Sequence, residues 1–409
     1  MIELKNNECC GCGACVNVCP KNCISMKVDA EGFEYPSVDK TSCINCGLCE
    51  KVCPINKQEP LRSNKPNTYA AKIKDDTIRN LSSSGGIFSI LANEILSKCG
   101  VVYGVALSDD LKQAQHIRVD NTEDIYKLRG SKYLQSKTGN IFNQVKSDLE
   151  DNKQVLFSGV PCQINGLKLF LRKEYENLLT VEVICHGVPS PALWLKYFDY
   201  LETKYNAKIQ KVNFREKRNG WKTFGLTEDG DNISQYLNLH HDPYMQMFLR
   251  NYCLRPSCYD CVAKKLESMA DLTIADFWGI QNVAPEMDDD KGTSLVLVQT
   301  KKGEKILDSL KEQFVSKKVD FDDGIKSNIS YWKSCDKPNE RNYFFDDMNT
   351  MSFSDLQAKY CKPIRRSLIK RGIGKAKLIL KHILRGVEHS NTSTQFEYGL
   401  LIQMTRDSE

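Results

Sequence analysis

Cysteines crowd the start of this chain, where thiols at defined spacings can form disulfides, bind zinc or hold iron–sulfur clusters. From Cys9 the spacing is C-x2-C-x2-C-x3-C followed by proline, and the same spacing recurs from Cys43, 34 residues further along. The repeated cysteines are Cys9, Cys12, Cys15 and Cys19, then Cys43, Cys46, Cys49 and Cys53. A structural zinc site usually combines two C-x2-C pairs across a longer loop and has no use for the additional cysteines. The doubled spacing therefore predicts two [4Fe-4S] clusters.

This spacing is the signature of bacterial two-cluster ferredoxins, in which the fourth cysteine of each run binds the cluster of the other run. We therefore predict two interleaved ligand sets: Cys9, Cys12, Cys15 and Cys53 for one cluster, and Cys43, Cys46, Cys49 and Cys19 for the second. Gly11, Gly13 and Gly47 allow the backbone to approach the clusters and to direct N–H groups at their sulfur atoms. Cys10 and Cys23 lie outside the pattern and are expected to be small buried apolar residues.

The composition of the whole chain is typical of a cytoplasmic enzyme. With 409 residues, of which 41% are hydrophobic, we expect two or three domains with a substantial core. No apolar segment precedes the first cysteine and no run of 18 apolar residues occurs, so neither secretion nor a membrane span is expected. The net charge of +5 is modest, and no basic stripe with interleaved aromatic residues lies outside the C-terminus, so nucleic acid is not an expected partner.

The segment after the cysteine repeat predicts a linker and then a phosphate-binding helix start. Residues 1–57 form the expected ferredoxin-type domain, and the polar, proline-bearing residues 58–67 are interpreted as a linker. Serines and glycines at 82–86 precede a predicted helix from about Ile87 and a β-branched strand from Val101. Free N–H groups at such a helix start can bind a nucleotide phosphate, whereas an ordinary serine N-cap with a flexible turn is the alternative.

Two later segments predict a strand, a rigid turn and a helix, with a cysteine in each turn. A strand at 154–158 leads through Cys162 into a helix whose apolar face contains Ile164, Leu167 and Leu171. A strand at 179–184 leads through Cys185 and His186 into a helix after Pro191. In α/β sheets, the turns at the carboxyl ends of strands form the ligand crevice. We therefore expect both cysteines to lie near a ligand.

A third cysteine group is one ligand short of a complete cluster site. The spacing C-x4-C-x2-C joins Cys253, Cys258 and Cys261. Either Cys185 or Cys162 could supply a fourth thiolate from a neighbouring turn, and we take Cys185 as the tentative fourth ligand of a third [4Fe-4S] cluster. A zinc site or plain buried thiols are the alternatives.

Several segments together resemble the family of coenzyme F420 hydrogenase/dehydrogenase beta subunits, fused behind a two-cluster ferredoxin domain. These segments are SSSGGIFSIL, RGSKYLQS, FSGVPCQINGLK, CHGVPSPALW, FREKRNGW, LRPSCYDC and ADLTIADFWGI. They run collinearly over about residues 66–320. The resemblance implies an α/β domain that binds FAD and exchanges electrons with nearby iron–sulfur clusters. Because the chain has no G-x-G-x-x-G fingerprint, the flavin rests on this resemblance and on the Ser/Gly helix start.

Carried over by motif, the resemblance implies a set of residues near the flavin. The implied cofactor-binding residues are Ser83, Ser84, Gly85, Gly86, Ser131, Tyr133, Gly159, Pro161 and Gln163, and the candidate catalytic residues are Lys132, Cys162 and His186. Each also has a structural interpretation: Lys132 as a surface cation, Tyr133 as a packing residue and His186 as a turn histidine bonded to backbone. A lowered pKa of Cys162 at a helix start would instead support thiol chemistry.

Charged residues in two of these segments have open roles. Asp276 is either an active-site carboxylate at a strand end or the residue that fixes the turn before Trp278. Arg215, Lys217 and Arg218 could bind an acidic substrate, although a run of charges is usually a solvated face.

The expected fold class is α+β: the ferredoxin-like domain, a mixed α/β flavin domain at 68–320 and a C-terminal extension at 321–409 with a basic helical tail. The expected function is an iron–sulfur flavoprotein oxidoreductase. Because each cluster carries one electron and most organic reductions need two, flavin would connect a ferredoxin-type donor to a small organic substrate, coenzyme F420 or another acceptor. The alternative is a non-catalytic electron-transfer subunit that docks a partner enzyme, such as a hydrogenase or dehydrogenase subunit.

The C-terminal segment at 362–389 predicts a basic amphipathic helix. Three interpretations are open for this helix. It packs against its own domain, it lies on the anionic inner face of the membrane as a peripheral contact, or it docks an acidic redox partner.

Overall fold

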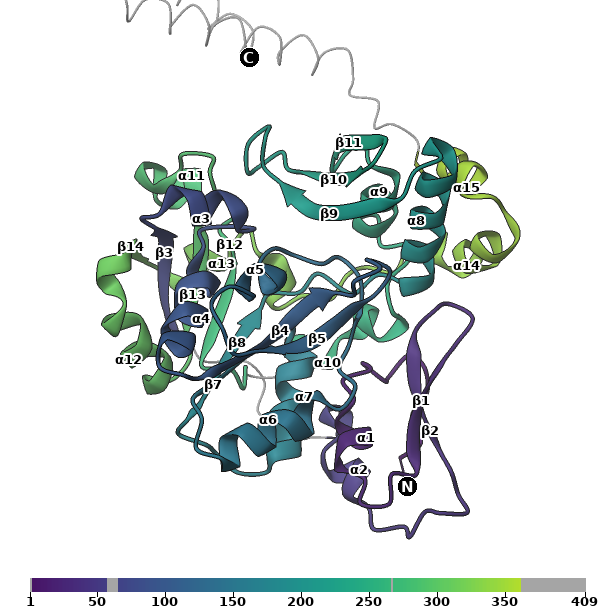
Figure 1. The fold of residues 1–409 in the computed structure, drawn as a ribbon, viewed down its shortest axis with the longest axis horizontal. Helices are drawn as coiled ribbons and strands as arrows, with labels where there is room; N and C mark the ends of the chain where they lie inside the picture. The colour runs from purple at the N-terminus through teal and green to yellow at the C-terminus, as the bar shows by residue number, and fades with distance from the viewer. Residues whose placement is uncertain (1, 57–64, 266–267, 362–409) are drawn as a thin grey trace, which may run out of the picture. The chain divides into compact units, whose positions relative to one another are not determined.

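The computed structural model describes residues 2–56, 65–265 and 268–361. In the N-terminal part, two short helices each begin after a glycine in the left-handed region (Figure 1). Helix α1 (Ala14–Val18) follows Gly13 with φ 78°, and α2 (Leu48–Lys51) follows Gly47 with φ 71°. Strands β1 (Ile24–Val28) and β2 (Glu34–Val38) pair antiparallel beside them. Glycine adopts this conformation without strain, so the chain can turn tightly between Cys12 and Cys15 and between Cys46 and Cys49.

A nine-stranded mixed sheet forms the centre of the main domain, in the order β14-β3-β13-β12-β8-β7-β4-β5-β6. Its four central strands, β12, β8, β7 and β4, are parallel, and β6 pairs parallel with β5 at one edge. The pairs β4–β5, β12–β13, β13–β3 and β3–β14 are antiparallel. The strands are β3 (Asn67–Ile73), β4 (Val101–Leu107), β5 (Ala114–Val119), β6 (Ser136–Lys137), β7 (Val155–Gly159), β8 (Leu178–Val183), β12 (Leu272–Asp276), β13 (Ser294–Val298) and β14 (Phe314–Val319). The mixed α/β sheet predicted for this domain is therefore present.

Helices cover both faces of this sheet, because side chains along its central strands alternate between two apolar cores. On β7, Val155 and Phe157 point into one core while Leu156 points into the other. Figure 1 shows α6 and α7 on one face, next to the N-terminal helices. The helices of this domain are α3 (Asp76–Leu81), α4 (Ile87–Ser97), α5 (Ile125–Leu128), α6 (Ile141–Glu150), α7 (Pro161–Leu171), α10 (Val262–Lys265), α11 (Ile280–Val283), α12 (Lys301–Ser309) and α13 (Phe321–Ile325).

A second sheet and four helices enclose an aromatic core. The sheet contains β9 (Ile209–Glu216), β10 (Gly225–Gly230) and β11 (Ile233–Asn238), all antiparallel. The helices are α8 (Pro191–Tyr205), α9 (Pro243–Leu249), α14 (Arg341–Thr350) and α15 (Phe353–Tyr360). Phe344, Phe353 and Leu356 pack into this core. These three residues of the expected C-terminal extension therefore pack within the described structure.

The structure confirms the strand–turn–helix predictions. Helix α4 begins at Ile87, β4 begins at Val101, α7 follows β7, and α8 begins at Pro191. The basic helix predicted at 362–389 lies outside the described residues. Within the described ranges, we find no helix that is long and apolar enough to cross a membrane.

Candidate functional site

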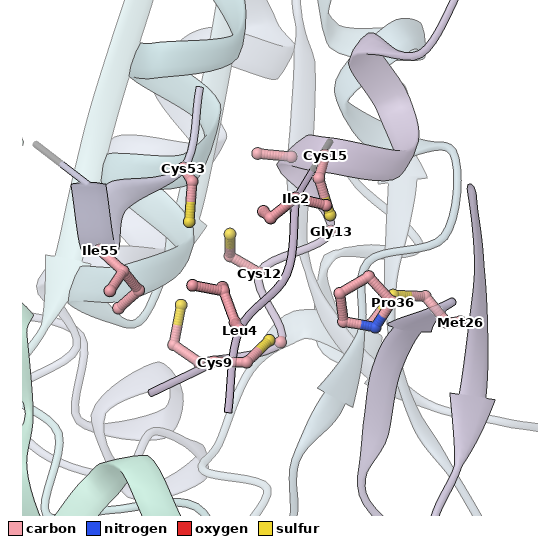
Figure 2. Close-up of a pocket in the computed structure, with 13 residues that line it drawn as sticks. Ile2, Leu4, Cys9, Cys12, Gly13, Cys15, Met26, Pro36, Cys53 and Ile55 are labelled. Carbon is pink, nitrogen blue, oxygen red and sulfur yellow. The ribbon is translucent and has the colours of Figure 1, made fainter. Parts of the chain in front are cut away.

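The first predicted cluster set lines one cavity, called cavity A. Cys9, Cys12, Cys15 and Cys53 line it together with apolar residues such as Ile2. Figure 2 shows the sulfur atoms of Cys9, Cys12 and Cys53 pointing toward a shared space. All four cysteines are buried. Burial, and after it the neighbouring thiols of Cys9 and Cys53, raises the pKa of Cys15 to about 12, so ionised thiolates there require a compensating positive charge such as iron.

The second predicted set lines cavity B, which lies nearer the surface. Cys19, Cys43, Cys46 and Cys49 line it, and Cys46 is exposed. The backbone N–H of Asn45 donates to the Cys43 sulfur at 3.4 Å, as expected for a thiolate that binds a cluster. In the described part of the chain, no group of His, Cys, Asp or Glu side chains is arranged to hold a single metal ion. A [4Fe-4S] cube occupies more space than one ion and separates its four thiolates more widely.

Hydrogen bonds join the residues around cavity A to the main domain. Thr138 Oγ1 donates to the Cys12 carbonyl at 3.1 Å, and Asn17 Nδ2 donates to the Gly139 carbonyl at 2.8 Å. A Cβ at Gly166 of α7 would lie 2.9 Å from the Cys12 sulfur. Helix α7 can therefore lie directly against a cysteine of the first set only because a glycine occupies that position.

A third cavity, called cavity C, gathers cysteines from four separate segments. Its cysteines are Cys10, Cys162, Cys185, Cys258 and Cys261. The backbone N–H of Val188 donates to the Cys258 sulfur at 3.5 Å. Cys253 does not line cavity C: it is 0% exposed and packs in the aromatic core. The structure therefore places Cys162, and not Cys253, beside the other three cysteines of the tentative third set.

The largest of the four cavities, cavity D, has a volume of about 670 Å³, within the range of small-molecule and cofactor sites. It lies at the carboxyl ends of the parallel strands β7, β8 and β12, which is where ligands bind in open α/β sheets. The predicted residues that line it are Ser83, Ser84, Gly86, Ser131, Lys132, Tyr133, Gly159, Gln163 and His186. Pro161 and Cys162 line cavity C instead, and Gly85 packs against Ser294, whose hydroxyl accepts from its N–H.

The serines at 82–84 do not cap helix α4. Its N-cap is Gly86, with φ 86° and no side-chain cap, so the serine N-cap interpretation is wrong. Ser83 Oγ accepts from the Ser131 N–H at 2.8 Å and lies 2.9 Å from the Ser131 hydroxyl. Gly130, with φ 83°, has open space where a Cβ would be. The loop that contains Ser83 and the loop that contains Gly130 and Ser131, together with the start of α4, form a polar wall that fits a phosphate-bearing cofactor.

The structure gives the three candidate catalytic residues different surroundings. Lys132 Nζ donates to the carbonyls of Lys127, Arg129 and Gly130 at 2.8–3.2 Å, so this ammonium shapes the loop. Burial lowers its pKa to about 7, while the three carbonyls oppose that shift by favouring the charged form. His186 Nε2 contacts Asn251 Oδ1 at 2.7 Å, so its partner is a side chain and not backbone.

Cys162 does not have the lowered pKa that thiol chemistry would require. A hydrogen bond with Cys10, and after it burial, raises the pKa of Cys162 well above that of a free thiol. This direction does not favour an activated nucleophile at the start of α7, and thiol chemistry at Cys162 stays a prediction.

The charged residues of the FREKRNGW segment are occupied by other contacts. Arg215 forms a bidentate pair with Asp276 at 2.6 and 3.1 Å, and Trp221 Nε1 donates to the same carboxylate at 2.8 Å. Lys217 Nζ donates to three backbone carbonyls, and Arg218 pairs with Glu216. Asp276 therefore holds Arg215 in the wall of cavity D instead of fixing the turn before Trp278.

Shared walls connect the cavities in series. Cys10 and Ile55 line both cavity A and cavity C. Val160, Gln163 and the turn 185–188 line both cavity C and cavity D. From the sequence, Cys10 is expected to be a packing residue, and neither Val160 nor Gln135 is expected to have a role, yet all three line cavity C. Gln135 could have been found because it lies within the segment RGSKYLQS, which resembles the family.

Comparison with known proteins finds family models that match three segments of the chain. The model described as "Coenzyme F420 hydrogenase/dehydrogenase, beta subunit N-term" matches residues 68–142, and that for the C terminus of the same subunit matches 152–323. A 4Fe-4S dicluster domain model matches residues 8–57.

Individual proteins are also similar to this chain. One subunit of the F(420)H(2) dehydrogenase of Methanosarcina mazei is 23% identical over 329 residues, or 76% of this chain and 84% of that protein. A chain of the F420-reducing [NiFe] hydrogenase complex from Methanosarcina barkeri aligns with a TM-score of 0.43 at 18% identity, over 64% of this chain and 84% of that chain. On the family matches, the chain belongs to the family of coenzyme F420 hydrogenase/dehydrogenase beta subunits and carries an N-terminal 4Fe-4S dicluster domain.

Proposed function

We propose that this chain is an iron–sulfur flavoprotein oxidoreductase that passes electrons between a ferredoxin-type donor and a small organic acceptor. The observation that supports it most is the series of cavities A, C and D, each sharing wall residues with the next. Flavin, when bound, exchanges electrons singly with clusters and in pairs with organic molecules. Cavity B, with the exposed Cys46, is the proposed side of electron entry.

The proposed metal ligands follow the cavities. Cavity A would hold one [4Fe-4S] cluster on Cys9, Cys12, Cys15 and Cys53, and cavity B the other on Cys19, Cys43, Cys46 and Cys49. In cavity C, a third cluster would be bound by Cys162, Cys185, Cys258 and Cys261. Cys162 lies in the first turn of α7, Cys185 lies in the turn after β8, and Cys258 and Cys261 lie just before α10.

The proposed FAD site is cavity D. Ser83 and Ser131, together with free N–H groups at the start of α4, would bind the phosphates. Lys132 would keep the loop after α5 closed through its three carbonyl contacts. His186 lines both cavity C and cavity D, so it would lie beside both the proposed cluster and the flavin.

In the proposed reaction, two molecules of reduced donor give one electron each. The acceptor takes up both electrons and one proton from water, so it is reduced by the equivalent of one hydride. The reverse reaction uses the same groups. Coenzyme F420 is the first acceptor to test, because the similar Methanosarcina mazei protein belongs to an F(420)H(2) dehydrogenase.

Cofactor analysis of the full chain, purified without oxygen, tests this proposal. We expect about 12 iron atoms per chain for three clusters, against about 8 for the dicluster domain alone, with matching acid-labile sulfide. FAD should be released on denaturation. Purified protein that contains iron but no flavin would contradict the proposal that this chain is a flavoprotein.

A matched pair of variants tests the third cluster. Cys258→Ser should lower the iron content by about 4 atoms per chain, because Cys258 lines cavity C. Cys253→Ala should keep the iron, because Cys253 lies outside cavity C in the same segment. Equal iron contents in the two variants would show that cavity C binds no cluster.

A second candidate function is a non-catalytic electron-transfer subunit that docks a partner enzyme. The observation that favours it is that the similar Methanosarcina mazei protein is one subunit of a dehydrogenase. Turnover of F420 or another small acceptor by the isolated chain would decide for the oxidoreductase, and its absence with all cofactors present would decide for the non-catalytic role.

A further inference from the structure

Arg255 is a fully buried cation at the boundary between the dicluster domain and the main domain. Its side chain is 0% exposed. Nε donates to the Cys9 carbonyl at 2.7 Å, and Nη2 donates to the Glu34 carbonyl at 2.9 Å. Nη1 donates to Gln135 Oε1 at 2.9 Å, and the Tyr35 ring lies 4.2 Å from the guanidinium carbon. The charge is therefore held by neutral oxygens and an aromatic face.

No carboxylate pairs with Arg255 among the described residues. The neighbouring acids have other partners: Glu31 pairs with Arg341 and Glu34 pairs with Lys137. An arginine side chain carries a fixed positive charge in proteins. Because an uncompensated charge in a protein interior is strongly unfavourable, the buried guanidinium requires a negative partner.

Cavity A provides that partner once a cluster is bound. A [4Fe-4S] cube held by four thiolates is an anion, and reduction adds a further negative charge. Arg255 contacts the peptide of Cys9, a proposed ligand of this cluster. Gly11 makes room for the contact, because a Cβ there would lie 2.9 Å from Arg255 Nη1.

We propose that Arg255 is the counter-charge of the cluster in cavity A and raises the reduction potential of that cluster by favouring its more negative reduced form. This inference rests on the proposed ligand set of cavity A. It makes Arg255 a positioning residue that adjusts how readily electrons leave the dicluster domain for the main domain.

A redox titration of the full chain, followed by electron paramagnetic resonance of the clusters, tests this role. Arg255→Met should make reduction of one cluster about tenfold less favourable, which is about 59 mV toward negative potential for one electron. Arg255→Lys keeps the charge and should restore most of the potential.

Arg341→Gln is the matched control. Arg341 is also buried and also joins the two domains, but its charge is already paired with Glu31 at 2.5 and 2.8 Å. The control changes the net charge by the same amount and should leave the potentials of all the clusters close to those of the unmodified chain.

A second variant covers the case in which Arg255→Met fails to fold or to keep its clusters. Gln135→Glu would place a carboxylate beside Arg255 Nη1 and should shift the same cluster in the same direction. Unchanged potentials in Gln135→Glu and in any folded Arg255→Met would overturn the inference. Iron analysis of the unmodified chain separates this outcome from a failure of the proposed function, because a chain without clusters fails before any potential is compared.

Discussion

At the scale of single residues, surroundings rather than residue type separate the proposed ligands from packing cysteines. Cys253 and Cys258 belong to one short segment, yet Cys253 packs among aromatic side chains and Cys258 lines cavity C. Cys10 lies outside the ferredoxin spacing but lines two cavities. A thiol therefore needs a shared space with other thiols before a cluster role follows.

Gly11 and Gly47 provide a matched test at this scale. Both are left-handed, with φ of 70° and 71°, but a Cβ at Gly11 would lie 2.6 Å from Gln135 Nε2, whereas Gly47 has nothing within 4 Å. Gly47→Ala should cost about 1–2 kcal/mol for the backbone alone, and Gly11→Ala about 1–3 kcal/mol more because it overpacks the domain boundary. Urea unfolding of the anaerobic chain measures both, and equal losses would contradict the contact.

Lys132 predicts a pH dependence of stability. Burial lowers its pKa to about 7 in the folded chain, below the value of an unfolded lysine. Between these values the unfolded chain binds more protons, so the free energy of unfolding should rise with pH, by at most about 1.4 kcal/mol per unit. Lys132→Met should flatten this rise, measured by urea unfolding between about pH 6 and 9. The exposed Lys127→Met is the control, and parallel curves for all three proteins would show that the carbonyl contacts keep Lys132 charged.

At the scale of elements, the parallel pairing of β7 with β8 brings the two cysteine-bearing turns together. Both strands end at the same edge of the sheet, so Gln163 and His186 line the same two cavities. Helix α7 then covers the sheet and contacts Cys12 through Gly166. The strand–turn–helix unit therefore holds one side of both proposed cofactors.

Helix α4 and the loop at 130–133 form one unit through Ser83. Ser83→Ala removes the contacts of this hydroxyl with Ser131 and should weaken FAD binding by roughly 5–30-fold, since hydrogen bonds of this kind contribute about 1–2 kcal/mol. Ser97→Ala, at the exposed end of the same helix, should leave the affinity unchanged. Equilibrium dialysis of reconstituted protein measures both affinities, and matching values would remove Ser83 from the proposed flavin site.

At the scale of the whole molecule, a few buried polar contacts join the dicluster domain to the main domain. Arg341 Nη1 and Nη2 both donate to the Glu31 carboxylate, which lies 310 residues away in the sequence. Asn17 and Thr138 add hydrogen bonds beside cavity A. These contacts keep cavities A and C adjacent, as the proposed transfer of electrons between them would require.

Glu31→Gln tests this joint. It leaves the buried Arg341 without its carboxylate and should cost about 2 kcal/mol of stability, with faster hydrogen exchange in β1 and β2. Glu3→Gln is the control in the same domain, because Glu3 pairs with Lys40 on the surface at 3.6 Å, where such pairs contribute little. If both variants exchange hydrogen equally, the Arg341 pair does not hold the domains together.

The sequence by itself determined the features that depend on neighbouring residues. The spacing of the ferredoxin cysteines predicts which three thiols of each run can share a cluster, because Cys9, Cys12 and Cys15 lie within seven residues, as do Cys43, Cys46 and Cys49. The helix starts at Ile87 and Pro191 follow from local breakers and apolar periodicity, and the structure confirms both.

Only the tertiary structure decided which distant residues meet. Cys162 instead of Cys253 joins cavity C because strand pairing places the end of β7 beside the turn after β8. Arg255 reaches the peptide of Cys9 across 246 residues of sequence, and no local pattern marks that contact. The physical reason is that side-chain periodicity determines which face of an element is buried, whereas the partner on that face depends on how all the elements pack.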